Sequence, residues 1–146
     1  MNEVQFHRVL RCPPERVYRA FLTADAMVKW LPPNGFTAKV HQMDARVGRT
    51  HRMSFTSFSS GKSHAFGGKY LELRQNELIR YTDVFDDPAL PGEMQTTVTL
   101  SAVSVGTELR IVQEGIPDAI PTEACYLGWQ ESLALLAKVV EAEISD

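Results

Sequence analysis

The last part of the chain carries apolar residues at helical spacing. Between residues 121 and 144 they recur every three or four positions, at Cys125, Trp129, Leu133, Leu136, Val140 and Ile144. This spacing places them on one side of an amphipathic helix. Pro121 suits a first helical turn, and Thr122 or Asp118 could cap it. We therefore predict a long helix over residues 121–144 that needs a broad apolar partner.

The rest of the chain begins with a strand and two short helices. Residues 3–11 alternate between apolar and polar side chains, as a half-buried strand does. The first helix is predicted to begin at Glu15. The second, capped by Thr23 or Asp25, is predicted to end at Trp30, because prolines, an asparagine and a glycine follow.

Six further strands are predicted between polar or glycine-containing turns, over residues 36–45, 49–58, 64–74, 78–85, 93–103 and 107–115. Gly67 and Gly68 indicate a flexible or bulged point in one of them. Strands joined by short turns pair antiparallel, and a sheet of this size curves strongly through its twist. We predict an α+β fold in which a curved antiparallel sheet of six to seven strands wraps the long C-terminal helix.

The composition narrows the class of protein. With 146 residues, 44% hydrophobic and 23% charged, the chain suits one globular domain over residues 1–146. A net charge of −3 without a concentrated basic face argues against a nucleic-acid partner. The sequence has no apolar run long enough for a membrane helix and no signal-peptide core, so we expect a cytoplasmic protein without membrane insertion. Two cysteines make no disulfide framework.

Three segments resemble a known superfamily. They are PPERVYRAFLTADAMVKWLPP, GGKYLELRQNELIRYTDVF and GWQESLALLAKVVE, at residues 13–33, 67–85 and 128–141. In this order they resemble the helix-grip superfamily, also called START-like or SRPBCC, over residues 4–144. The most similar branch is homologous to the C-terminal domain of the activator of the 90-kDa heat-shock-protein ATPase. The resemblance implies a ligand cavity between the sheet and the C-terminal helix.

The known roles of superfamily members indicate what function to expect. They carry lipids, hormones or polyketides, so the resemblance implies a hydrophobic, aromatic or lipid-like ligand. The eukaryotic namesake of the branch stimulates a chaperone. We expect that activity not to transfer, because the sequence shows no counterpart of the namesake's additional N-terminal domain.

Aromatic and apolar side chains are the candidates for the cavity wall, although they could also simply fill the core. Trp30 precedes the loop LPPNGF and is the expected gate. Gly128 weakens a helix, and either a close backbone approach or ligand space would explain it. The predicted ligand-binding residues are Trp30, Phe36, Phe55, Phe66, Tyr81, Asp83, Phe85, Met94, Cys125, Trp129 and Leu133.

Two carboxylates are candidates for acid–base chemistry. Asp83 and Glu114 each lie at the end of an otherwise apolar strand. The strand phase puts Asp83 on the side of Tyr81, so it is expected inside, where a carboxylate can act as a general base. The alternative is a carboxylate paired with Arg80, Arg110 or water.

The histidines and cysteines are weaker candidates for metal binding or catalysis. His41, His51 and His64 lie on successive predicted strands, but their spacing matches no zinc signature, and hydrogen-bonded or solvated histidines are favoured. Cys125 lies on the apolar stripe of the helix with no evident base nearby, so it is expected as a wall residue rather than a nucleophile. We expect no metal and no cofactor.

Three functions remain open. The leading hypothesis is binding of a hydrophobic small molecule without a catalytic role. A cyclase- or hydratase-like enzyme would use Asp83 or Glu114 as its base. A protein-interaction module akin to the chaperone activator would use an exposed apolar patch and a chaperone partner. Homodimerisation through an exposed strand edge or the loop at residues 86–92 is also left open by the sequence.

Overall fold

One antiparallel sheet of seven strands dominates the computed structural model, which describes residues 2–145. The order across the sheet is β1-β7-β6-β5-β4-β3-β2, so only β1 and β7 are neighbours that are distant in the chain. The strands are β1 Glu3–Leu10, β2 Phe36–Met43, β3 Thr50–Ser57, β4 Ser63–Arg74, β5 Leu78–Phe85, β6 Met94–Val103 and β7 Gly106–Glu114.

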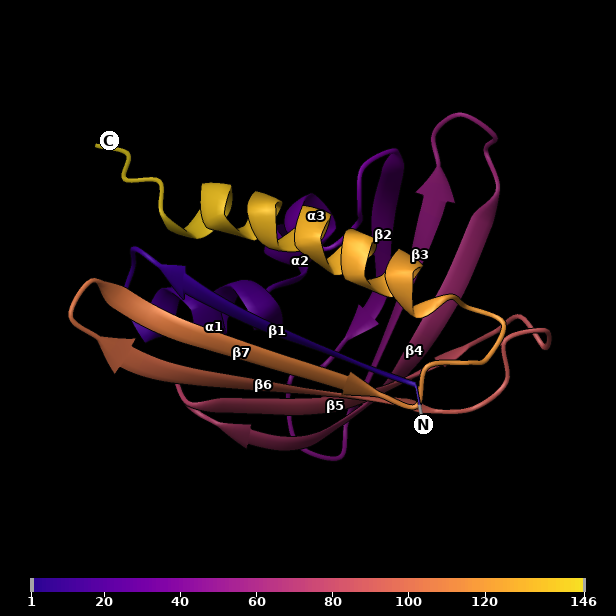
Figure 1. Ribbon diagram of the computed structural model, residues 1–146, viewed down its shortest axis with the longest axis horizontal. Helices are drawn as coiled ribbons and strands as arrows, with labels where there is room; N and C mark the ends of the chain where they lie inside the picture. The colour runs from indigo at the N-terminus through magenta and orange to yellow at the C-terminus, as the bar shows by residue number, and fades with distance from the viewer. Residues whose placement is uncertain (1, 146) are drawn as a thin grey trace.

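Three helices complete the described part of the chain. The helices α1 (Pro14–Leu22) and α2 (Ala24–Trp30) follow β1, and α3 (Thr122–Val140) follows β7. In Figure 1, α3 lies across the sheet, with β1 and β5 to β7 on one side and β2 to β4 turned up beside its N-terminal half. The predicted α+β helix-grip fold is confirmed, including the two short helices after the first strand.

The apolar stripe of α3 faces the sheet as its spacing predicts. The buried residues of this helix are Trp129, Ser132, Leu133, Leu136 and Val140. Apart from the adjacent pair Ser132 and Leu133, they recur at intervals of three and four. Opposite them, the inner face of the sheet supplies alternate side chains such as Ile79, Val98, Leu109 and Ile111. The core therefore lies between one face of the sheet and one side of a helix.

The C-terminal helix is shorter than predicted. It ends at Val140, and the side chain of Ile144 is 81% exposed. An apolar side chain with nothing to pack against gives the helix no reason to continue. Pro121 is the N-cap residue and no side chain caps the helix. Asp118, a predicted cap, instead accepts a hydrogen bond from Asn2 Nδ2 at 2.8 Å.

Gly67 and Gly68 lie where β4 passes close to its neighbours. A side-chain carbon on Gly68 would collide with the carbonyl oxygen of Thr82, and one on Gly67 would collide with that of His51. The register irregularity in the pairing of β4 with β5 comes later, just after Tyr70. The predicted bulge is therefore displaced along the strand, and the two glycines are explained by close backbone approach.

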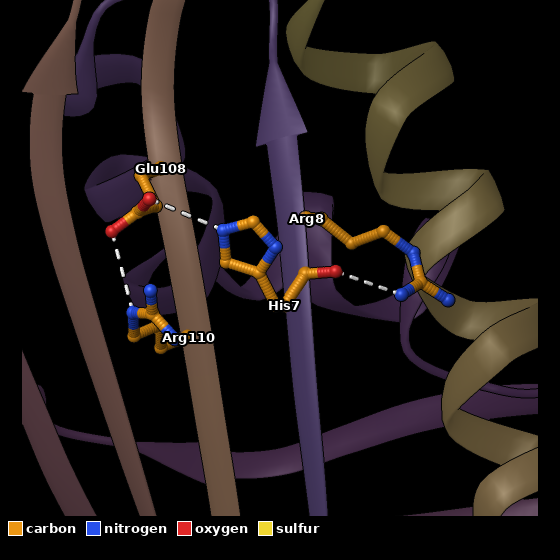
Figure 2. A network of polar contacts seen from close by, with 4 residues as sticks. All are labelled: His7, Arg8, Glu108 and Arg110. Carbon is orange, nitrogen blue, oxygen red and sulfur yellow. Dashed lines mark hydrogen bonds and ion pairs between the residues drawn. The ribbon is translucent and has the colours of Figure 1, made fainter.

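The outer face of the sheet carries exposed polar contacts between β1 and β7. Figure 2 shows His7 of β1 beside Glu108 of β7. The carboxylate of Glu108 also contacts Arg110. His7 Nε2 lies 3.2 Å from Glu108 Oε2, and Arg110 Nε donates to Glu108 Oε1 at 3.3 Å. Arg8, the next residue of β1, points to the opposite face of the sheet from His7 and donates to the carbonyl oxygen of His7 at 2.9 Å. The exposed contacts of His7, Glu108 and Arg110 identify the solvent face of the sheet and contribute little to stability.

Candidate functional site

A pocket of about 380 Å³ lies between the inner face of the sheet and the N-terminal half of α3. Residues from α2, the loop after it, six strands and α3 form its wall. Most of the predicted ligand-binding residues lie on this wall, namely Phe36, Phe55, Phe66, Tyr81, Asp83, Phe85, Met94, Cys125 and Trp129. Trp30 and Leu133 do not.

The side-chain period of each strand and helix explains why these residues meet at the pocket. Tyr81, Asp83 and Phe85 are alternate residues of β5, and alternate residues of a strand share one face. On α3, the wall residues Gly128, Trp129 and Ser132 follow Cys125 by three, four and seven positions, which places all four on one side of the helix.

Trp30 lies in the core rather than at a rim. Its side chain is 0% exposed, and Nε1 donates a hydrogen bond to the carbonyl oxygen of Ala20 at 3.0 Å. Its ring packs edge-on against Phe21, with centroids 4.7 Å apart. This tryptophan joins α2 to α1, so the structure does not support the predicted gate. Leu133 is likewise a core residue, 3% exposed.

Polar side chains hold α3 to the sheet and to the end of α2 beside the pocket. Trp129 Nε1 donates to Gln113 Oε1 at 3.0 Å, and Gln113 Nε2 donates to Thr96 Oγ1 at 3.1 Å. Ser132 Oγ donates to the carbonyl oxygen of Leu31 at 2.5 Å. Sequence reasoning missed both Gln113 and Ser132. Gln113 continues the two-residue period of Leu109 and Ile111, which was the available signal.

Asp83 is the carboxyl group inside the pocket. It is 7% exposed, and among the described residues its Oδ1 has no hydrogen-bond partner. Burial raises the pKa of Asp83 to about 8, because a charge is costly away from water. The predicted alternative of an arginine partner is not what the structure has: Arg80 donates to Glu72 Oε1 at 2.8 Å, and Arg110 contacts Glu108.

His51 is the nearest basic group to this carboxyl. Its Nε2 lies 3.6 Å from Asp83 Oδ1 and 3.1 Å from the carbonyl oxygen of Thr82. A carbonyl oxygen only accepts, so Nε2 carries the proton and donates it to Thr82. Burial lowers the pKa of His51, although the hydrogen bond to Thr82 opposes this. A neutral histidine that donates elsewhere leaves Asp83 without an ion-pair partner.

Glu114 does not join Asp83. On β7 the buried residues Leu109, Ile111 and Gln113 face the helix, so Glu114 belongs to the alternate set on the outer face. The structure therefore separates the two carboxylates that sequence reasoning grouped as acid–base candidates. On Cys125, burial raises the thiol pKa, which disfavours the nucleophilic thiolate.

The three candidate histidines do not form one site. His41 is exposed and its Nε2 lies 2.9 Å from Ser54 Oγ, whereas His51 and His64 lie on the pocket wall. Within residues 2–145, no three histidine, cysteine, aspartate or glutamate side chains lie close enough together to hold a metal ion.

Gly128 faces open space, because a side-chain carbon built there meets no atom within 4 Å. A close backbone approach therefore does not explain it. We expect Gly128→Ala to raise the free energy of unfolding by about 1 kcal/mol, since alanine is the better helix former. The exposed Ala134 on the same helix provides the control: Ala134→Gly should cost a similar amount. Urea unfolding of both variants measures this, and a loss of stability in Gly128→Ala would contradict the open space.

No helix in the part of the chain that the structure describes is both long and apolar enough to cross a membrane.

Comparison with known proteins gives the relationships of this chain. The sequence profile of the family "Activator of Hsp90 ATPase homolog 1-like protein" matches residues 11–141. A crystal structure of a protein from Chromobacterium violaceum is 62% identical in sequence, with a TM-score of 0.96 over 97% of this chain and 99% of that chain.

More distant structures share the fold. A protein of Rhodobacter sphaeroides is 20% identical, with a TM-score of 0.81 over 94% of this chain and 90% of that chain. A protein of Rhizobium leguminosarum is 22% identical, with a TM-score of 0.79 over 97% of this chain and 95% of that chain. No curated protein matches the sequence significantly. On the profile match and the 62% identity, the chain belongs to the activator of Hsp90 ATPase homolog 1-like family.

Proposed function

We propose that the protein binds an apolar small molecule in the pocket between the sheet and α3, without chemical turnover. The observation that carries the proposal is the pocket itself. Its volume of about 380 Å³ falls within the range of small-molecule sites, and its wall is mostly aromatic, aliphatic and sulfur-containing. Such a wall favours a ligand with a ring or hydrocarbon body.

Two features of the wall support a pocket that exists before a ligand arrives. The hydrogen bonds from Trp129 to Gln113 and from Ser132 to Leu31 hold α3 at its distance from the sheet and from the loop after α2. Phe36 is 38% exposed and His64 is also exposed, so a ligand would enter past these two residues. A preformed site saves the free energy of ordering on binding.

The other two functions have weaker support. An enzyme of the cyclase or hydratase kind would use Asp83 as its base, because Glu114 lies on the outer face. Burial raises the pKa of Asp83 to about 8, so at neutral pH the carboxyl is protonated and is a poor base. A protein-interaction module fits the family membership, and a chaperone partner or a homodimer would use exposed apolar residues. The most exposed of these, Phe58, Leu127 and Ile144, lie on different segments of the chain.

The proposal is tested by measuring ligand binding before and after a larger side chain on α3 occupies the pocket. Native mass spectrometry of freshly purified protein, followed by denaturing extraction, identifies any bound molecule, and equilibrium dialysis measures binding of 2-ethylnaphthalene as an apolar probe. We expect Gly128→Leu to abolish binding of the probe, because its side chain would enter the pocket. Ala134→Leu adds a similar side chain at an exposed position of α3 and should bind like the wild type. Failure of the wild type to bind would contradict the proposal.

A further inference from the structure

Among the described residues of the pocket wall, Asp83 carries the one buried side-chain nitrogen or oxygen atom without a hydrogen-bond partner. The side chains of Gln113, Ser132 and His51 already donate to Thr96 and to the carbonyl oxygens of Leu31 and Thr82. Asp83 Oδ1, by contrast, is buried on the wall without a partner among residues 2–145. A buried polar atom left unpaired in this way costs free energy unless a ligand satisfies it.

The charges around this carboxyl are few. Neither lysine nor arginine lies on the described pocket wall. The titratable groups that face it are His51 of β3, Tyr70 and His64 of β4, Tyr81 of β5 and Cys125 of α3, while β6 and β7 contribute the uncharged Met94 and Gln113. An anionic ligand would therefore find no lysine or arginine to neutralise its charge on the described wall.

The protonation state of Asp83 determines what it can offer. Burial raises its pKa to about 8, so at neutral pH the carboxyl keeps its proton. A protonated carboxyl is a hydrogen-bond donor. The same burial raises the pKa values of Tyr70 and Tyr81, so both phenols stay neutral as well.

We propose that the ligand is an uncharged, mostly apolar molecule with one hydrogen-bond acceptor, such as a ketone or ester carbonyl, which accepts a hydrogen bond from the carboxyl group of Asp83. This inference rests on the proposed function and names its ligand class. A carbonyl satisfies the unpaired group at the small cost of its own desolvation. A cation would have to leave water and also ionise a carboxyl that the wall keeps neutral, which is the more costly exchange.

A matched set of probes tests the inference. The probes are 2-acetylnaphthalene, 2-ethylnaphthalene and a naphthylmethyl-trimethylammonium cation, which share one ring system and differ in the polar group. Equilibrium dialysis at pH 6.5 should show the acetyl compound binding about threefold to tenfold more tightly than the ethyl compound, the effect of one additional hydrogen bond. At pH 9 this preference should disappear, because an ionised carboxyl cannot donate.

Two variants separate the donor from the shape of the pocket. Asp83→Asn keeps an N–H donor that does not titrate, so the preference for the acetyl compound should persist at both pH values. Asp83→Leu has no donor, so both compounds should bind equally while the ethyl compound still binds. Both variants remove a buried ionisable group and are expected to fold.

The outcomes distinguish the two proposals. If the ethyl compound binds the wild type but the acetyl compound binds no more tightly, the ligand class is wrong and the binding function stands. Tightest binding of the cation, strengthening towards pH 9, would overturn the inference in favour of a cationic ligand. If none of the three probes binds, the proposed function itself fails.

Discussion

Asparagine in place of Asp83 is expected to stabilise the protein, and by about 3 kcal/mol more at pH 8.5 than at pH 5.5. In an unfolded chain an aspartate ionises near pH 3.9, whereas burial raises the pKa of Asp83 in the native protein to about 8. Between these values the unfolded state has released a proton that the native state still holds. The contribution of Asp83 to stability is therefore fully present below about pH 4 and falls as the pH rises towards 8.

The variant removes this pH dependence because an amide does not titrate. Urea unfolding of both proteins across pH 5.5 to 8.5 measures the difference in free energy of unfolding. Asp87→Asn makes the same chemical change on an exposed loop residue and should follow the wild type. Parallel profiles for Asp83→Asn and the wild type would mean that Asp83 is ionised and solvated in the pocket. That result would also remove the donor on which the proposed ligand class depends.

The pattern of apolar residues was enough to predict the sheet and the inward face of the strand over residues 78–85. The strand over residues 78–85 has the predicted bounds, and Asp83 faces inward with Tyr81 as its phase requires. The stripe through Trp129, Leu133 and Leu136 is buried as predicted. These features depend on periods of two and of three to four residues, which the sequence carries directly.

The sequence did not specify which side chains pack against one another across the fold. A tryptophan beside a loop is compatible with a gate or with a core, and only the packing of α2 against α1 places Trp30 in the core. The separation of Asp83 from Glu114, by contrast, was within reach of the sequence. Asp83 is in phase with Tyr81, whereas Glu114 is out of phase with the buried Leu109 and Ile111 of its strand. The end of α3 also depended on tertiary contact, because the sheet offers nothing for Ile144 to pack against.

The two tryptophans should respond differently to truncation, although both are buried. Trp30→Ala is expected to cost about 3–5 kcal/mol, because the ring is enclosed on all sides and the hole it leaves cannot collapse. Trp129→Ala should cost less, about 2–3 kcal/mol, because this ring borders the pocket and has protein neighbours on fewer sides. Urea unfolding measures both costs.

Phenylalanine at each position separates the ring from its hydrogen bond. Trp129→Phe keeps most of the packing but leaves Gln113 Oε1 without its donor, and Trp30→Phe does the same to the carbonyl oxygen of Ala20. Each should cost about 1–3 kcal/mol, the penalty of a buried acceptor left unpaired. If Trp129→Ala cost as much as Trp30→Ala, Trp129 would be packed on all sides. The space beside it would then be closed in solution, and the function argued from the pocket would lose its basis.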